Sequence, residues 1–212
     1  MNLERPFRTV TPTLDGDVLT VLARADAAFT GREVYRRIGT ASHRGVQVAL
    51  ERLTVQGIVT REHAGRSNLY RLNRDHLAAP FIEGIAALRL RLIQELRAAI
   101  EGWVLQPVVA ALFGSAARGD ADERSDIDIF LIRPRNVGVD DDRWREQVRT
   151  LEGSATAWTG NEARTLEYAE DEARQLASEE PVVREVIEEG IALAGSLAVL
   201  RKRPGNRHGD EP

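Results

Sequence analysis

The feature that most constrains this chain is a strand that carries two acids. In SDIDIFLI, residues 125–132, acidic and aliphatic residues alternate. Because successive side chains of a strand point to opposite faces, Asp126 and Asp128 are expected on one face and the alternating isoleucines on the other. Residues two apart on a strand are separated by roughly 7 Å, so both carboxylates can converge on one cation. The pair is therefore a candidate metal site, and the alternative is an acidic strand face exposed to solvent.

A turn of small residues precedes this strand. Residues 107–113 (PVVAALF) predict a buried strand, and Gly114 and Ser115 end it before AARG, which is long enough for one helical turn. Glycine lets the backbone approach a ligand closely, and a serine hydroxyl and the free N–H groups of a helix start can donate to phosphate oxygens. Alone, such a turn is more often a plain strand-to-helix cap. The acid pair further along the chain favours a phosphate site.

Taken together, these residues resemble the signature of the DNA polymerase beta-like nucleotidyltransferase superfamily. Gly114 and Ser115 are followed by ten intervening residues and then by the Asp126 and Asp128 pair, and the form GSAARG is similar to the small minimal nucleotidyltransferases. The resemblance covers about residues 104–195, with a helix expected over 140–158 and a later strand. It implies an α/β fold with a short mixed sheet. It also implies that the Gly-Ser turn holds the triphosphate of an NTP substrate and that the aspartates hold Mg²⁺, or alternatively Mn²⁺.

That family expects a third metal-binding carboxylate on a following strand. In ARTLEYAE, Glu167 stands between two apolar residues and is the candidate. Glutamate in place of the commoner aspartate adds one methylene, which changes the metal geometry. Glu162 and Glu170 are interpreted as the solvated ends of the same strand.

The residue inventory fits chemistry based on carboxylates and arginines. The chain has no cysteine and four scattered histidines, and it lacks the sequence patterns of P-loop enzymes, zinc proteases and serine hydrolases. Arg118, next to the small-residue turn, either contacts a phosphate or pairs with Asp120 or Asp122 of the acidic loop.

The charge of the chain is unevenly distributed. Residues 1–79 hold 12 arginines against 8 acids, a charge of +4, whereas the remainder holds 17 basic against 25 acidic residues, a charge of −8. Such a split predicts two domains with different partners.

The basic half resembles a winged helix-turn-helix domain, an α+β fold. The resemblance rests on the order of predicted elements: helices over residues 14–25, 31–39 and 42–56, then a hairpin of residues 58–63 and 68–73. Ser42 is expected to cap the second helix of the turn, with His43, Arg44 and Gln47 on its outward face and Arg66 at the hairpin tip. These residues are candidates for contact with duplex DNA. The alternative is a domain that serves only packing or dimerisation.

The remaining segments complete the predicted organisation. Residues 80–103 predict one long linking helix, whose apolar stripe either packs on a domain or forms a homodimer interface. The nucleotidyltransferase domain is expected over 104–196, and 197–212 as a disordered tail. No apolar run approaches the roughly 20 residues of a membrane span, and the N-terminus lacks a signal-peptide core, so the expected location is the cytoplasm.

The sequence thus predicts a two-domain enzyme that transfers NMP from an NTP to an unidentified protein or tRNA acceptor. The family resemblance also suggests membership of a toxin–antitoxin pair. The alternative is a DNA-binding transcriptional regulator whose transferase domain only senses a nucleotide or is inactive.

Overall fold

The computed structural model of the chain describes residues 1–172 and 180–201. It divides into two compact units, residues 1–90 and residues 91 to the C-terminus. The boundary lies inside the segment predicted as a linking helix. Each unit is described by itself.

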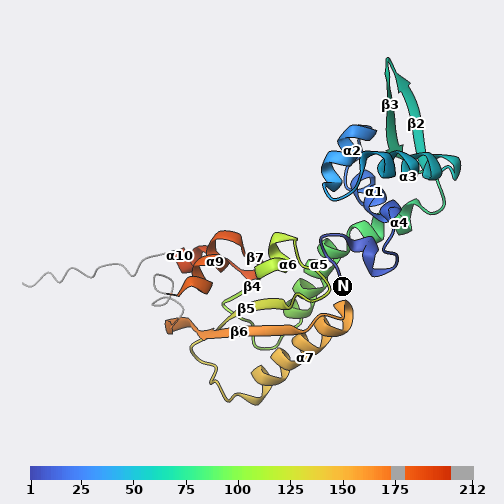
Figure 1. Cartoon of the computed structure of the whole chain (residues 1–212). Coiled ribbons are helices and arrows are strands. Elements are labelled where there is room, and N and C mark those ends of the chain that lie inside the picture. The colour runs from blue at the N-terminus through green and yellow to red at the C-terminus, as the bar shows by residue number, and fades with distance from the viewer. Residues whose placement is uncertain (173–179, 202–212) are drawn as a thin grey trace, which may run out of the picture. The chain divides into compact units, whose positions relative to one another are not determined.

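The first unit combines helices with a small antiparallel sheet (Figure 1). Its elements are η1 (Pro6–Thr9), α1 (Leu14–Ala23), β1 (Phe29–Thr30), α2 (Gly31–Ile38), α3 (His43–Val55), β2 (Val59–Ala64), β3 (Ser67–Leu72) and α4 (Ala79–Ala86). The strand order is β1-β3-β2. Apolar residues of all three main helices and of the strands form one buried core, including Val18, Leu22, Val34, Leu50 and Tyr70. The predicted helices and hairpin are present.

Local capping explains where the helices of this unit begin. The Thr30 hydroxyl accepts from the Glu33 backbone N–H, while the Glu33 carboxylate accepts from the Thr30 N–H, which is a capping box. Gly39 then ends α2 in the left-handed conformation, with φ of 71°. The Ser42 hydroxyl starts α3 by accepting from the Gly45 N–H at 3.0 Å. These signals are all local in sequence, so the helix boundaries were predictable.

The hairpin closes through two residues. Ala64 pairs with Ser67, which leaves Gly65 and Arg66 as the turn. Gly65 has a φ of 62°, the positive value that a type II′ turn needs at its first central position. Arg66 therefore lies at the hairpin tip, as predicted.

The single helix predicted over residues 80–103 is wrong. The segment forms two helices, α4 and α5 (Leu88–Glu101), with a break at Ala87, whose N–H bonds to the carbonyls of Glu83 and Ile85. The predicted stripe is also divided: Leu92, Leu96 and Ile100 are buried, but Phe81 is 74% exposed. Apolar spacing alone did not reveal the break, because the spacing continues across it.

The second unit is built on a mixed sheet of four strands, as expected. After α5, the elements of this unit are β4 (Val109–Phe113), α6 (Gly114–Arg118), β5 (Ile127–Arg133), α7 (Asp142–Thr159), β6 (Ala163–Ala169), α9 (Pro181–Glu189), β7 (Ile191–Gly195) and α10 (Ala198–Arg201). The strand order is β6-β5-β4-β7, and β5 and β6 are parallel while the other pairs are antiparallel. The short helix α10 occupies a segment predicted to be disordered, and residues 202–212 of that prediction lie outside the described residues.

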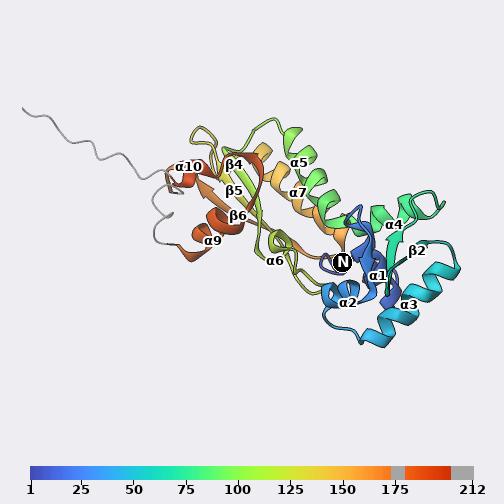
Figure 2. The same cartoon turned by 90° about the horizontal axis from the view of Figure 1, so that it is seen from above.

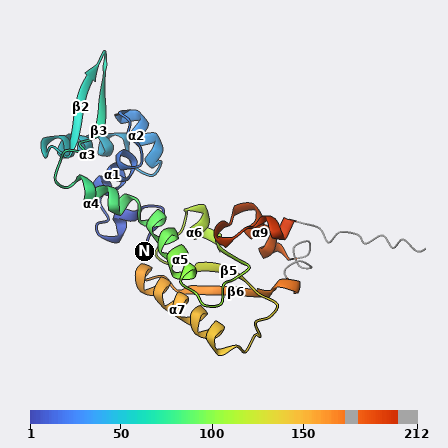
Figure 3. The same ribbon diagram turned by 180° about the vertical axis from the view of Figure 1, so that it is seen from behind.

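The two faces of this sheet are covered by different helices (Figure 2). On one face, Val183 and Val186 of α9 pack against Phe113 and Phe130 of the central strands. On the other face lies α7, whose Trp144 is fully buried. Figure 3 shows the same arrangement from behind, with α7 and α9 on opposite sides of β5 and β6. Successive side chains of β5 and β6 therefore point alternately to the face covered by α9 and to the face covered by α7.

None of the helices in the described part of the chain combines the length and apolar character that spanning a membrane would require.

Candidate active site

The Gly-Ser turn and the acid pair meet at one end of β4 and β5. Phe113, the last residue of β4, pairs with Asp128. Gly114 follows with a φ of 68°, and a Cβ built on it would lie 2.7 Å from Oδ2 of Asp128. Both the backbone conformation and the lack of space require glycine here. The structure thus brings Gly114 against Asp128, two residues that the sequence separates by a loop.

Asp126 and Asp128 are both half-buried, Asp126 directly before β5 and Asp128 within it. Burial raises the pKa of Asp128, and the nearby charges of Asp126 and Glu185 raise it further, whereas Arg164 and Arg118 oppose this effect. A carboxylate that is partly desolvated and faces a second carboxylate gains from a bound cation. This donor set fits one divalent ion that takes its other ligands from phosphates and water.

The third carboxylate expected for this site is not found beside the pair among the described residues. Within residues 1–172 and 180–201, no group of three or more histidine, cysteine or acidic side chains has an arrangement that could hold a metal ion. The predicted triad is thus not assembled in the described part of the chain.

Glu167 does not lie beside the aspartates, and the expectation that it projects toward them is wrong. In the parallel pairing of β5 with β6, Asp128 is level with Arg164, whereas Glu167 is level with Leu131. Since side chains alternate between faces, Glu167 lies on the α7 face. Its carboxylate accepts from Nε of Arg133 at 2.6 Å and from Nε1 of Trp144 at 2.8 Å.

The contacts of Glu167 predict a structural role. Glu167→Gln is expected to lower the free energy of unfolding by about 1 to 3 kcal/mol, the range for a hydrogen bond to a charged group, because the Arg133 side chain is only 12% exposed and loses its counter-ion. Binding of Mg²⁺ and nucleotide is expected to stay near the parental value. Denaturant unfolding measures the expected loss of stability, and calorimetry measures the expected unchanged binding. Loss of binding without loss of stability would instead place Glu167 in the metal site.

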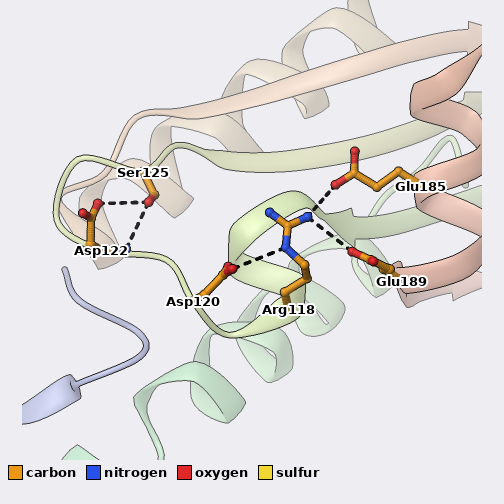
Figure 4. A network of polar contacts seen from close by, with 6 residues as sticks. All are labelled: Arg118, Asp120, Asp122, Ser125, Glu185 and Glu189. Atoms are coloured by element: carbon orange, nitrogen blue, oxygen red, sulfur yellow. Dashed lines mark hydrogen bonds and ion pairs between the residues drawn. The ribbon is translucent and has the colours of Figure 1, made fainter. Parts of the chain in front are cut away.

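Ser115 and Arg118 lie on α6, the short helix of the turn. Phe113, the N-cap residue of α6, makes no side-chain capping bond, and Ser115, the second residue of the helix, is half-buried. Arg118 is exposed, and its guanidinium lies among acidic side chains (Figure 4). Its guanidinium lies 2.7 Å from Glu185 and 3.3 Å from Glu189, both on α9, and 3.5 Å from Asp120. Asp122 instead holds its own loop by accepting from Ser125 and from the Arg124 N–H.

Sequence reasoning missed Arg164. Its Nη1 lies 3.1 Å from Oδ2 of Asp126, and its Nη2 lies 2.9 Å from Oε2 of Glu162. Glu162 lies beside Asp126 because its backbone carbonyl accepts a hydrogen bond from the N–H of Ile127, the residue that follows Asp126. The alternation of β6 was visible in the sequence, but its register against β5 was not.

In the first unit, the candidates for DNA contact have different surroundings. Arg44 and Arg66 are exposed, and neither has an ion-pair partner among the described residues. His43 is also exposed and packs edge-on against Tyr35, with ring centroids 5.6 Å apart. Ser42 uses its hydroxyl as the α3 cap.

The prediction that Gln47 lies on an outward face is wrong. Its amide lies over Gly31, where a Cβ would approach Nε2 to 1.9 Å. Gln47 is accordingly half-buried against α2. The absence of a side chain at Gly31 leaves the space that Gln47 fills.

Comparison with known protein families finds a match for the second unit. Residues 93–194 match the family model of the nucleotidyltransferase domain. The chain therefore contains a nucleotidyltransferase domain, and the protein is an enzyme of the nucleotidyltransferase class. The search of curated proteins found no match.

Two solved structures are similar over about half of the chain. One is described as a toxin-antitoxin with AMP-PNP, with 14% identity over 51% of this chain and 77% of that chain, and a TM-score of 0.36. The other is a mutant of the toxin-antitoxin MntA-HpeT, with 15% identity over 51% and 77% of the two chains, and a TM-score of 0.37.

Proposed function

We propose that the second unit transfers NMP from an NTP, with Mg²⁺ or Mn²⁺, to a hydroxyl of an acceptor that is a protein or an RNA such as tRNA. The observation that carries this proposal is the contact of Gly114 with Asp128. It sets the backbone of a turn that begins with a glycine directly against one of the two half-buried carboxylates.

In this mechanism each residue of the site has a separate task. The turn that starts at Gly114 binds the triphosphate through its backbone and through the hydroxyl of Ser115, because both can approach phosphate oxygens closely. Asp126 and Asp128 would hold the divalent ion, and the bound ion would supply charge neutralisation for the leaving pyrophosphate and a lower pKa for the acceptor hydroxyl. The aspartates thereby also orient the α-phosphate toward the acceptor.

The experiment is calorimetric titration of the full chain with each of the four NTPs, with Mg²⁺ and with EDTA, followed by incubation of labelled nucleotide with cell extract. Magnesium-dependent binding of at least one NTP and transfer of label to a macromolecule are expected. Absence of binding for all four would reject the proposal. Identification of the labelled acceptor would also decide whether this protein forms a toxin–antitoxin pair with a partner, as the family resemblance suggests.

We further propose that the first unit is a winged helix-turn-helix module that binds duplex DNA. Its support is the order of helices and hairpin, the +4 charge of residues 1–79 and the exposure of Arg44 and Arg66 at the start of α3 and the hairpin tip. A helix start and a hairpin tip are places from which such domains reach the grooves and the backbone of DNA.

Removal of Arg44 tests the DNA proposal. Arg44→Ala is expected to weaken binding to a selected duplex by about 1 to 3 kcal/mol if the side chain reads a guanine edge. Arg52→Ala is the matched control, because Arg52 lies on the same helix but pairs with Asp15. Gel-shift assays at several salt concentrations measure both variants. If Arg44→Ala equals the parent and no duplex is preferred, the unit belongs to the packing or dimerisation class.

A further inference from the structure

Arg164 occupies a distinctive place in the second unit. It is level with Asp128 on the neighbouring parallel strand and lies on the same face of the sheet. Its two terminal nitrogens contact different acids: Nη1 forms an ion pair with Asp126 at 3.1 Å, and Nη2 donates a hydrogen bond to Glu162 at 2.9 Å. The guanidinium thus bridges a predicted metal ligand and an acid outside the pair.

The register makes Arg164 the β6 residue closest to the acid pair on this face. The next residue on the same face, Leu166, packs with the apolar cluster of Phe130 and Val183. A third acid on β6 would need the position that Arg164 fills. Among the described residues, β6 therefore contributes a guanidinium, rather than a third carboxylate, beside the Asp126 and Asp128 pair.

Asp126 has two competing uses for the same oxygen. Oδ2 is the atom that Arg164 contacts, and it is also available to a cation held by the pair. The Arg164 side chain is 60% exposed and Asp126 is 36% exposed, so the ion pair is open to exchange. A surface ion pair of this kind contributes little free energy, so a divalent ion readily outcompetes it.

We propose that Arg164 is a counter-ion that exchanges partners when the nucleotide binds. In the free protein it neutralises Asp126. Once Asp126 binds the divalent ion, Arg164 keeps its bond to Glu162 through Nη2 and donates through Nη1 to a phosphate oxygen of the nucleotide. The planar guanidinium suits both partners, because its fork matches carboxylate and phosphate geometry alike. This inference rests on the function proposed above and assigns a phosphate-contacting residue to that site.

The exchange predicts effects of opposite sign for Arg164→Ala. Mn²⁺ alone is expected to bind about two- to fivefold more tightly, because Asp126 has lost its competing cation. A non-hydrolysable analogue of the tightest-binding NTP, titrated with Mn²⁺ present, is expected to bind at least about tenfold more weakly, because a charge-assisted hydrogen bond is lost. Electron paramagnetic resonance of free Mn²⁺ gives the first value and calorimetry gives the second.

A matched control and a conservative variant make the test specific. Arg149→Ala changes the net charge equally but removes only an exposed pair with Glu146 on α7, so neither affinity is expected to change. Arg164→Lys keeps the positive charge but lacks the planar pair of guanidinium donors. Compared with Arg164→Ala, it is expected to recover part of the nucleotide affinity.

The outcomes separate this inference from the function on which it rests. If Arg164→Ala behaves as Arg149→Ala in both titrations, Arg164 is a passive surface ion pair and the inference is wrong. If both affinities fall together, the side chain only supports the local structure, and the inference is also wrong. If the parent binds no NTP with either Mg²⁺ or Mn²⁺, the proposed function fails and the inference fails with it.

Discussion

Asp128→Asn is expected to reduce nucleotidyl transfer by at least about a thousandfold, or about 4 kcal/mol in the activation barrier. The substitution keeps the shape of the side chain but removes the charge that faces Gly114 and the start of α6. Without that charge, only Asp126 remains to hold the divalent ion, and the α-phosphate loses its alignment. Incorporation of labelled nucleotide into cell extract measures the rate, and calorimetry is expected to show weakened but measurable nucleotide binding.

This loss is expected without loss of stability. The pKa of Asp128 is raised in the folded protein, chiefly by burial. The folded state therefore binds the proton more tightly than the unfolded state, and stability falls as the pH rises from the ordinary aspartate pKa to the raised value. Asparagine removes that penalty, so above this window the variant should unfold at the parental temperature or higher. Asp140→Asn, at a side chain 87% exposed, is the control and should keep full activity. Equal activity in the two variants would refute the role of Asp128.

Gly114→Ala is expected to abolish binding of nucleotide with Mg²⁺ and to destabilise the fold. The backbone φ of 68° places an alanine in the left-handed region, which costs about 1 to 2 kcal/mol. The added methyl group would also lie 2.7 Å from Oδ2 of Asp128, so the carboxylate must move. Displacement of Asp128 separates it from the turn that we propose binds phosphate.

Gly160→Ala separates these two effects. Gly160 ends α7 with a similar φ of 72°, but its Cβ would meet nothing within 4 Å. This variant should show the same backbone strain, measured by denaturant unfolding, with unchanged nucleotide binding. If Gly114→Ala still binds nucleotide as Gly160→Ala does, the turn does not form the phosphate site.

The parts of the site that were predicted from the sequence depend on local patterns. The strand, the turn at Gly114 and the shared face of Asp126 and Asp128 follow from residues that are neighbours in the chain. Glu167 depended instead on the register between β5 and β6, which long-range pairing sets. A shift of one residue reverses the face of every side chain, so the alternating pattern identified the strand but could not identify its inner face.

The same distinction explains the differences elsewhere in the fold. The helix starts at Thr30 and Ser42 were predicted because capping residues act within one turn. The break at Ala87 was missed because its apolar neighbours keep helical spacing on both sides. Gln47 was assigned to the outside by periodicity, but the space above Gly31, contributed by another helix, accommodates its amide. Local signals predicted the elements, and contacts between elements decided which side chains reach a surface.

The burial of Trp144 in the second unit also has a spectroscopic consequence. All three tryptophans, at positions 103, 144 and 158, belong to the second unit, and the first unit has none. Trp144 is fully buried and lies edge-on to Trp103, with ring centroids 5.4 Å apart. Its emission should shift to longer wavelength when the transferase unit unfolds, whereas circular dichroism registers helices in both units. A comparison of the two melting curves therefore reveals whether the units unfold together or independently, without an added label.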